Sequence, residues 1–278
     1  MKKLTFALVV SLIAVNLDCE AAIINGGFEN GLNGWTTIGD VSIQTSSIGV
    51  TPTQGRNQAL LTTLCNDGLT PAFCNGDGGE LPYSGVSALP AEQVQQWLGF
   101  SSDPFEFFNQ TKAFIGFPLR GEGSGIRTLI HAHGGSSIIF DWNGVSMGPE
   151  GDTAYWTLAS ADLGLNFFAA GTLFAGGFSP YQPSEMDLRS RSPDRISNCP
   201  RGTEDTCVPN VESGYRNGSI SVPYDGWFYL GFGMGETAEG TVASAVLIDN
   251  LRIVPEPASL LLTFGPLFLV GLRAVHRN

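Results

Sequence analysis

The chain has 278 residues, a formal net charge of −12, and charged side chains at only 14% of positions. Proteins that bind nucleic acid need clusters of lysine and arginine for the phosphates, and no basic stripe is present, so we expect no nucleic-acid partner. The 36 glycines and the short runs of alternating apolar residues favour strands and turns over helices.

Residues 1–21 predict a secretory signal peptide. Two lysines precede an apolar run from Leu4 to Val15, and Ala21 ends a small-x-small cleavage site. The apolar run is shorter than the roughly 20 residues that span a bilayer. We therefore expect cleavage after Ala21 and export of the remainder. Lipidation at Cys19 is the alternative, although Asp18 stands where a small residue is wanted.

Residues 22–253 predict one all-β ectodomain with a single short helix. We expect strands at Val41–Gln44, Asn57–Thr63, Ser124–Ala132, Ser137–Trp142, Thr153–Ala159, Asn166–Leu173, Trp227–Phe232 and Ala243–Ile253. Gly134 and Gly135 predict a hairpin turn between the third and the fourth of these strands. The helix is predicted at Ala91–Leu98, where apolar residues recur at helical spacing and Glu92 lies in the first turn.

Four cysteines remain once the signal peptide is removed, namely Cys65, Cys74, Cys199 and Cys207. Two close pairs in an exported chain predict two local disulfides, although four cysteines allow three connectivities. The second pair lies in Ser179–Asn217, a polar stretch with five prolines that we expect to be a long loop.

The C-terminal end joins a short motif, an apolar run and a basic tail. In order, these are Pro255, Glu256 and Pro257, the run that ends at Leu272, and then Arg273 and Arg277. Basic residues beyond a membrane segment stay in the cytoplasm. Residues 254–278 thus resemble the PEP-CTERM sorting signal, with its short transmembrane segment. The resemblance implies recognition and cleavage by exosortase, a protease-transpeptidase of the inner membrane. An ordinary tail anchor is the alternative.

The ectodomain carries a second resemblance. The opening INGGFENGLNGW, residues 24–35, resembles the first strand of galactose-binding-like carbohydrate-binding jelly rolls. The stretches GSGIRTLIHAHGGSSIIFDWNG (123–144) and LGFGMGETAEGTVASAVLIDNLRIVPEP (230–257) resemble a common ectodomain of PEP-CTERM proteins. The resemblance implies a two-sheet jelly-roll sandwich with long loops, in which the first and last strands lie close together.

The same resemblance implies a structural Ca²⁺ between the first and last strands. Glu29 and Asp249 are the carboxylates at the matching positions. Ca²⁺ prefers oxygen ligands, and two neighbouring carboxylates repel each other unless a cation or a proton intervenes. The alternative is that both side chains cap turns by accepting hydrogen bonds from backbone amides. We expect no other cofactor.

The motifs of common enzyme classes are missing from the sequence, so we expect a protein without catalysis. Ser124 in Gly-Glu-Gly-Ser-Gly departs from the nucleophile-elbow pattern, and neither a P-loop nor a dinucleotide-binding motif in its proper context is present. His131 and His133 alternate on a predicted strand, so their rings face one side, but no third metal ligand is near in sequence.

Aromatic residues supply the candidate ligand contacts. Trp97, beside the predicted helix end, and Tyr181, in the long loop, are candidates for contact with a sugar. Trp227 and most other aromatics are expected in the core, because burying one contributes about 2–3 kcal/mol. The sequence predicts an exported, exosortase-processed surface or extracellular matrix protein associated with exopolysaccharide. A carbohydrate-binding module with a defined glycan ligand is the alternative.

Overall fold

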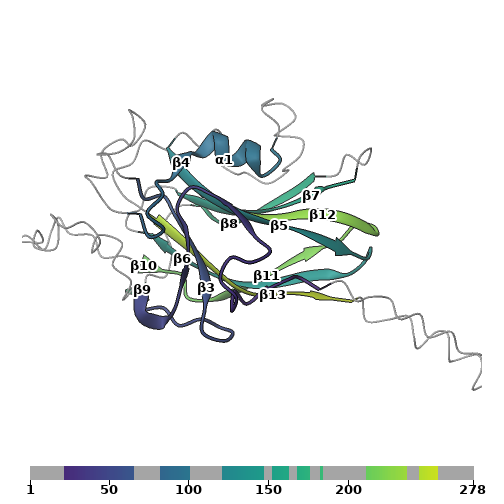
Figure 1. Ribbon diagram of the computed structural model, residues 1–278, viewed down its shortest axis with the longest axis horizontal. Helices are drawn as coiled ribbons and strands as arrows, with labels where there is room; N and C mark the ends of the chain where they lie inside the picture. Colours follow the sequence, from purple (N-terminus) through teal and green to yellow (C-terminus); the bar gives the residue numbers. More distant parts are fainter. Residues whose placement is uncertain are drawn as a thin grey trace, which may run out of the picture.

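The structure is a computed structural model that describes residues 22–65, 82–100, 121–146, 152–162, 168–175, 182–183, 211–236 and 244–255. In these residues two antiparallel β-sheets pack face to face, with one α-helix outside them (Figure 1). The predicted two-sheet jelly-roll sandwich with one short helix is therefore confirmed.

Sheet A has β5 and β12 at its centre. Its order is β1 (Thr36–Ile38), β5 (Glu122–Ala132), β12 (Gly226–Gly235), β7 (Thr153–Ser160) and β8 (Phe168–Ala175), and β4 (Leu89–Pro90) also pairs with β5. β5 and β12 pair over ten residues each, from Gly226 opposite Ala132 to Gly235 opposite Gly123. This long central pair carries the surface on which the candidate site lies.

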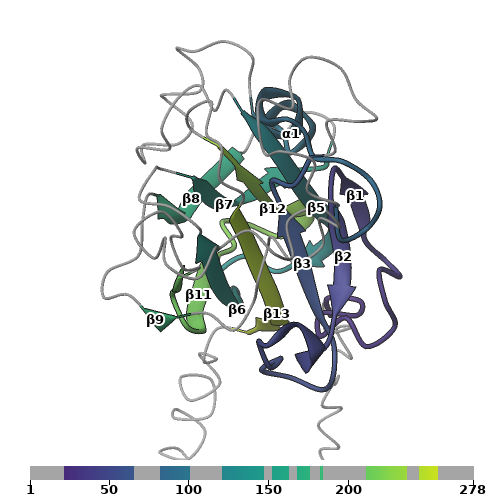
Figure 2. The ribbon, with the colours of Figure 1, turned by 90° about the vertical axis from the view of Figure 1, so that its left-hand side faces the viewer.

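Sheet B has the C-terminal strand in its interior. Its order is β2 (Val41–Gln44), β3 (Gln58–Thr62), β13 (Ser244–Val254), β6 (Ser137–Ser146), β10 (Val211–Glu212) and β9 (Gln182–Pro183), and β11 (Arg216–Ser221) also pairs with β6. A short 3-10 helix, η1 (Ser46–Ile48), follows β2. β1 and β2 lie at one side of the sandwich, and β8 and β9 lie at the other (Figure 2).

Alternate side chains of the long strands fill the space between the two sheets. On β12 the core residues are Phe228, Leu230, Phe232 and Met234. The ring of Phe140 on β6 reaches across to Phe232, with 4.9 Å between the ring centroids. Because successive side chains of a strand point to opposite faces, the residues between these core positions lie on the outside of the sheet.

Residues 24–35 form consecutive turns, so the expectation of a first strand there is wrong. The backbone N–H of Phe28 donates to the carbonyl of Asn25 at 3.1 Å, and that of Trp35 donates to Leu32 at 3.0 Å. Asn25 and Phe28 have φ angles of 57° and 56°, in the left-handed region, which regular strand residues do not adopt. Phe28 and Trp35 are nevertheless buried against each other, with ring centroids 5.2 Å apart.

The N-terminal turns lie against the C-terminal strand, as the resemblance implies. The N–H of Leu251 on β13 donates to the carbonyl of Gly26 at 3.0 Å. A Cβ at Gly26 would lie 2.1 Å from the carbonyl oxygen of Leu251, so only glycine allows this approach. The two ends of the ectodomain are therefore joined by backbone contact.

The turn at Gly134 and Gly135 crosses from one sheet to the other, so the predicted hairpin is wrong. β5 pairs with β1, β4 and β12 in sheet A, whereas β6 pairs with β13, β10 and β11 in sheet B. Both strands bury one face in the same core, Ile130 from one side and Ile138 from the other. The chain therefore folds over the end of the core instead of doubling back within one sheet.

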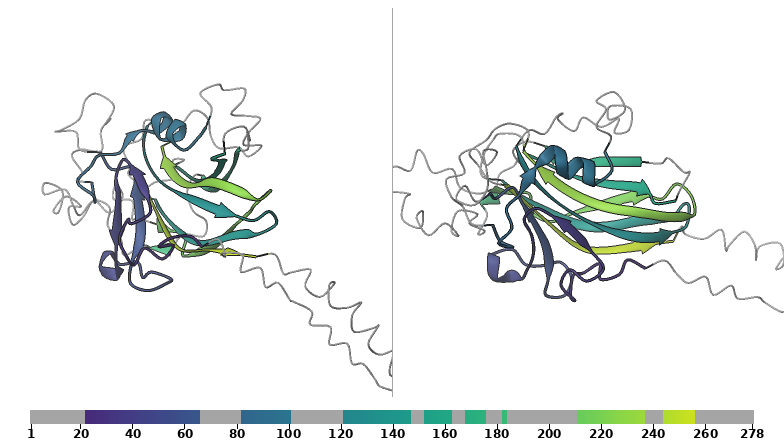
Figure 3. Two further views of the ribbon diagram at one scale, coloured as in Figure 1. Left: turned by 45° about the vertical axis from the view of Figure 1, so that its right-hand side comes forward. Right: turned by 45° about the horizontal axis from the view of Figure 1, so that its top comes forward.

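The helix α1 (Ala91–Trp97) lies on the outer face of sheet A (Figure 3). Three glycines of β5 and β12 lie beneath it: Gly125, Gly231 and Gly233. A Cβ at Gly233 would lie 2.6 Å from Cδ1 of Leu98 and 2.5 Å from Cζ of Tyr155. A missing side chain at these positions lets the helix approach the sheet closely. Val94 and Leu98 are buried in the cluster that results.

The segment predicted as one long loop includes strand residues. β9, β10 and the first residues of β11 fall within Ser179–Asn217, and all of them belong to sheet B. The predicted loop is therefore wrong for these positions. They pair with the sheet although their sequence is polar and short, because main-chain hydrogen bonds do not depend on side-chain type.

Several predictions concern positions outside the described residues. These are the signal peptide, Cys74, Cys199, Cys207, Glu256, Pro257, Arg273 and Arg277. Cys65 is buried and disulfide-bonded, and the pairing of the four cysteines stays a prediction. Within the described ranges, no helix is both long and apolar enough to cross a membrane. Pro255 directly follows β13.

We expect Gly233→Ala to lower the free energy of unfolding by about 1–3 kcal/mol, the usual cost of overpacking a filled core. Neither Tyr155 nor Leu98 can move away easily, because both are buried. Chemical denaturation measures the change. Leu129→Ala, on the part of the same face that α1 leaves open, serves as the control, with a change of at most about 0.5 kcal/mol. Equal changes in the two variants would contradict the close docking of α1.

Candidate functional site

The outer face of sheet A has a covered half and an open half. α1 covers the half that carries the three glycines. The open half consists of Arg127, Leu129 and His131 of β5 with Trp227 and Tyr229 of β12. In the register of the two strands, His131 is opposite Trp227 and Leu129 is opposite Tyr229. We call these five residues the open face.

Large apolar side chains are exposed on the open face. The exposed fractions are 47% for Trp227, 40% for Tyr229 and 46% for Leu129. Their neighbours on the same strands, such as Phe228 and Ile130, are buried in the core. Scattered exposed apolar residues are common, but a contiguous group on one rigid sheet marks a surface for contact with another molecule.

Arg127 and Trp97 form the border between the helix and the open face. The guanidinium carbon of Arg127 lies 4.1 Å from the ring centroid of Trp97 and 5.0 Å from that of Tyr229. Arg127 Nη1 also donates a hydrogen bond to the carbonyl oxygen of Trp97 at the helix end. Desolvation by partial burial lowers the pKa of Arg127, and the nearby Tyr229 opposes this shift. The guanidinium is thus held in one place between two rings.

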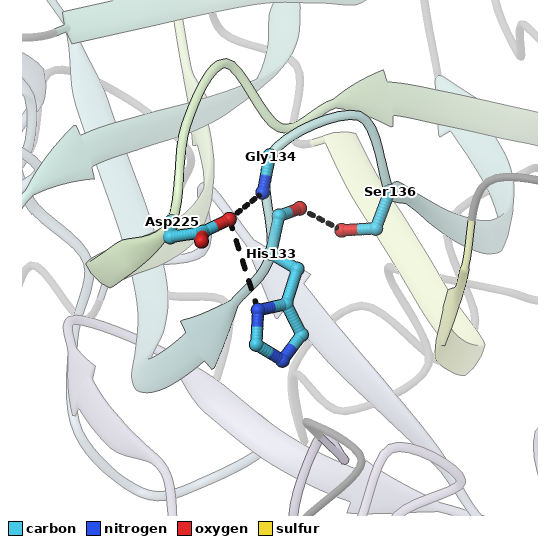
Figure 4. A network of polar contacts seen from close by, with 4 residues as sticks. All are labelled: His133, Gly134, Ser136 and Asp225. Atoms are coloured by element: carbon cyan, nitrogen blue, oxygen red, sulfur yellow. Dashed lines mark hydrogen bonds and ion pairs between the residues drawn. The ribbon is translucent and has the colours of Figure 1, made fainter. Parts of the chain in front are cut away.

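Two loops form the opposite border of the open face. The carboxylate of Asp225 accepts a hydrogen bond from the N–H of Gly134 at 2.7 Å and lies 3.7 Å from Nδ1 of His133 (Figure 4). The hydroxyl of Ser136 donates to the carbonyl of His133 in the same turn. These contacts tie the loop between β5 and β6 to the loop between β11 and β12.

The histidine rings extend the open face towards these loops. The ring of His131 lies edge-on to Trp227, with 5.1 Å between the centroids, and 5.5 Å from the ring of His133. The two rings do face one side of β5, as the alternation predicts. In the described ranges no group of three or more His, Cys, Asp or Glu side chains could hold a metal ion.

The predicted aromatic contacts are only partly placed by the structure. Trp97 is half-buried against Arg127 at the edge of the open face, and Tyr181 lies outside the described residues. The assignment of Trp227 to the core is wrong. In the sequence WFYLGF, the core takes Phe228, Leu230 and Phe232, so Trp227 must point outward. The alternation in this strand was the signal that could have identified it.

Glu29 and Asp249 both bind the turn before β3, at different points. Glu29 Oε1 accepts hydrogen bonds from the N–H groups of Arg56 and Asn57 at 2.7 and 2.9 Å. Asp249 Oδ2 accepts from the N–H groups of Thr53 and Gln54 at 2.7 and 2.8 Å. This is the turn-capping arrangement. The calcium site stays a prediction, and the ligand atoms of the described residues do not assemble one.

The two carboxylates respond to their surroundings in opposite directions. The amide hydrogen bonds from Arg56 and Asn57 lower the pKa of Glu29, because they favour the ionised form. Burial raises the pKa of Asp249, and the hydrogen bonds from Gln54, Asn250 and Thr53 oppose that rise. Glu29 therefore stabilises the fold as a carboxylate, while the ionisation of Asp249 carries a desolvation cost.

A depression lies on the outer face of sheet B. Its volume is about 270 Å³, and it is lined by Ile139, Phe140, Asp141, Asn217, Gly218, Ser219 and Arg252. Both oxygens of Asp141 already accept hydrogen bonds, from the side-chain amides of Asn217 and Asn250. No exposed aromatic ring is among its lining residues. The open face of sheet A is therefore the stronger candidate for a binding surface.

No protein-family model and no curated protein matches the chain. Among solved structures it is similar to TmCBM61 in complex with β-1,4-galactotriose, at 11% identity and a TM-score of 0.38, covering 84% of this chain and 96% of that one. It is also similar to the K1 cleaved adhesin domain of Lys-gingipain from Porphyromonas gingivalis W83, at 12% identity and a TM-score of 0.38, covering 82% and 95%. A family 16 carbohydrate-binding module matches at 12% identity and a TM-score of 0.33, covering 84% and 98%.

We expect Glu29→Gln to lower the melting temperature at pH 7 slightly. The lowered pKa of Glu29 means that its stabilising effect is complete above the ordinary value of 4.5 and is lost as the pH falls through the folded-state pKa. The difference between wild type and variant should therefore close in acid, as thermal melts between pH 7 and pH 2 would record. Glu92→Gln controls for the loss of one surface charge. A constant difference across this range would contradict the capping role of Glu29.

Proposed function

We propose that this chain is an exported, non-catalytic surface protein that binds glycans on the open face of sheet A. The observation that carries the proposal is the exposure of Trp227 and Tyr229 on a strand whose alternate residues are fully buried. A sugar ring has an apolar face of C–H groups, and an aromatic ring offers a large apolar surface with a definite orientation. Burial of both surfaces on contact would favour binding.

The rigidity of the open face supports the same proposal. Each of its five residues lies on one of the two central strands of sheet A, which pair with each other over ten residues. Binding groups on paired strands lose little conformational freedom when a ligand arrives, and this loss is one of the main costs of association. Ala159 and Ala161 of the neighbouring segment are opposite Tyr229 and Trp227, and such small residues leave the aromatic rings accessible.

The shape of the open face favours an internal segment of a polysaccharide over a chain end. The face is the surface of a sheet, bordered by α1 and Trp97 at one end and by the His133–Asp225 loops at the other. Among the described residues of this face, Trp227 is about half exposed. A polymer could therefore cross the sheet without having to end there.

Export and processing complete the proposal and rest on the sequence. The signal peptide and the Pro-Glu-Pro tail would deliver the chain to the cell surface or the extracellular polymer layer, after cleavage by exosortase. A glycan-binding face would be useful there, because it would hold the protein in exopolysaccharide once its membrane segment is removed. The purely structural matrix role needs no exposed aromatic face, so we favour glycan binding.

Trp227→Ala and Tyr229→Ala should each weaken glycan binding at least tenfold, which corresponds to about 1.4 kcal/mol. Each substitution removes one aromatic surface from the open face without touching the core, so the melting temperature should stay close to that of the wild type. Isothermal titration with glycans selected on an array would measure the loss.

Val86→Ala is the matched control for these variants, because Val86 is an exposed apolar residue that does not belong to the open face. Its affinity should equal that of the wild type. Unchanged affinity in both aromatic variants would refute the assignment of binding to the open face. Equal losses in Val86→Ala and the aromatic variants would do the same, since the loss would then not depend on this surface.

The protein recovered from its host should have an intact mass that lacks residues 1–21 and the residues beyond the Pro-Glu-Pro region. It should also be four hydrogens lighter than the reduced chain, because two disulfides are predicted. Mass spectrometry of medium, surface and membrane fractions would test this. A protein that keeps residues 260–278 in the membrane fraction would instead be tail-anchored, and the exosortase proposal would fall.

A further inference from the structure

In the part of the chain that the structure describes, Arg127 is a cation without an ionic partner on a strongly acidic protein. The chain has 26 Asp and Glu residues and only 14 Lys and Arg residues. Even so, among the described residues of the open face and its borders the ion pair is that between His133 and Asp225. No described carboxylate pairs with Arg127. Among the described residues, the one hydrogen-bond acceptor of its guanidinium is the carbonyl oxygen of Trp97.

This arrangement has a physical cost that the described residues offset only in part. Partial burial removes water from the guanidinium, and the resulting desolvation lowers the pKa of Arg127. Contact with the rings of Trp97 and Tyr229 returns part of the lost solvation through cation–π attraction. Within the described residues one carbonyl serves the five N–H donors of the guanidinium, so most of these donors remain available to water or a ligand.

From this unpaired guanidinium and the aromatic rings beside it, we propose that the open face recognises an acidic glycan, with the carboxylate of a uronic acid bound by Arg127. This inference rests on the proposed glycan-binding function and names its ligand class. The planar fork of a guanidinium matches the two oxygens of a carboxylate, and such charge-assisted hydrogen bonds are about twice as strong as neutral ones.

The spacing of the residues on the open face allows Arg127 to bind the carboxylate while the aromatic rings contact the sugar rings. Tyr229 contacts Arg127 on one side and is two residues from Trp227 on the same strand. A uronate over Tyr229 would therefore place its carboxylate next to the guanidinium, while the following sugar in the chain would lie over Trp227. The rings of Trp97 and Tyr229, 4.1 and 5.0 Å from the guanidinium carbon, restrict where the guanidinium can lie.

The net charge of −12 restricts how such a ligand can be bound. The protein repels a polyanion at long range, so general attraction between opposite charges does not explain binding of acidic glycans here. Affinity must come from local contacts at Arg127 and the aromatic rings. A short oligosaccharide is therefore a better probe than a polymer, since it carries few charges away from the site.

The test compares each uronate oligosaccharide with its carboxyl-reduced counterpart, which has the same linkages and ring configuration. Trimers of galacturonate, mannuronate and glucuronate, each with its reduced form, would be titrated into the full mature ectodomain. For at least one pair we expect the uronate to bind at least tenfold more tightly. Arg127→Met keeps an apolar stem of similar length without charge, and should reduce this preference to about twofold or less. Arg127→Lys should retain part of it.

Each outcome of this comparison is decisive. Equal affinity for the acidic and reduced forms in the wild type would overturn the acidic-glycan inference and leave the proposed function intact. A preference that survives in Arg127→Met would also overturn it, since the carboxylate would then be bound elsewhere. Failure of every oligosaccharide to bind would overturn the proposed function as well. Thermal melts of Arg127→Met, together with its affinity for the reduced forms, show whether the variant is folded.

Discussion

The close packing of α1 on three glycines determines which part of sheet A can act as a surface. A helix can approach a sheet closely only where the sheet surface carries no large side chains. Gly125, Gly231 and Gly233 provide such a surface on two neighbouring strands. Where the glycines end, the side chains of the same strands become large, and the helix ends as well. The same two strands thus bury one half of their outer face and expose the other half.

The N-terminal segment is fixed in a comparable way by its contacts with β13 and with the turn before β3. Gly26 approaches the backbone of Leu251, while Glu29 and Asp249 each accept hydrogen bonds from backbone amides of that turn. These contacts join three segments that are far apart in sequence. They use the carboxylates as acceptors for backbone amides, and for Glu29 the nearby positive charge of Arg56 also favours the ionised form.

The sequence predicts the elements of this fold better than their arrangement. Periodicity places β2 and α1 within a residue of their observed bounds, because local alternation and helical spacing depend on neighbouring residues alone. It does not tell which sheet a strand joins. The turn at Gly134 has the composition of a hairpin, yet it crosses between sheets, since the partners of β5 and β6 come from distant parts of the chain. Long-range pairing of this kind leaves no local signal.

The candidate site was not predicted from the sequence, for a related reason. Trp227 is assigned to the core if each aromatic is judged by its burial energy alone, whereas the alternation of WFYLGF requires that only one set of its aromatics faces inward. β5 shows the same division, with Ile126 and Ile130 inside and Arg127 outside. On the outer face of sheet A, the arginine and histidine of β5 lie next to the tryptophan and tyrosine of β12. Neither set alone identifies a surface, but the pairing of β5 with β12 brings a cation and aromatic rings to one place, and the proposed binding of an acidic glycan uses both.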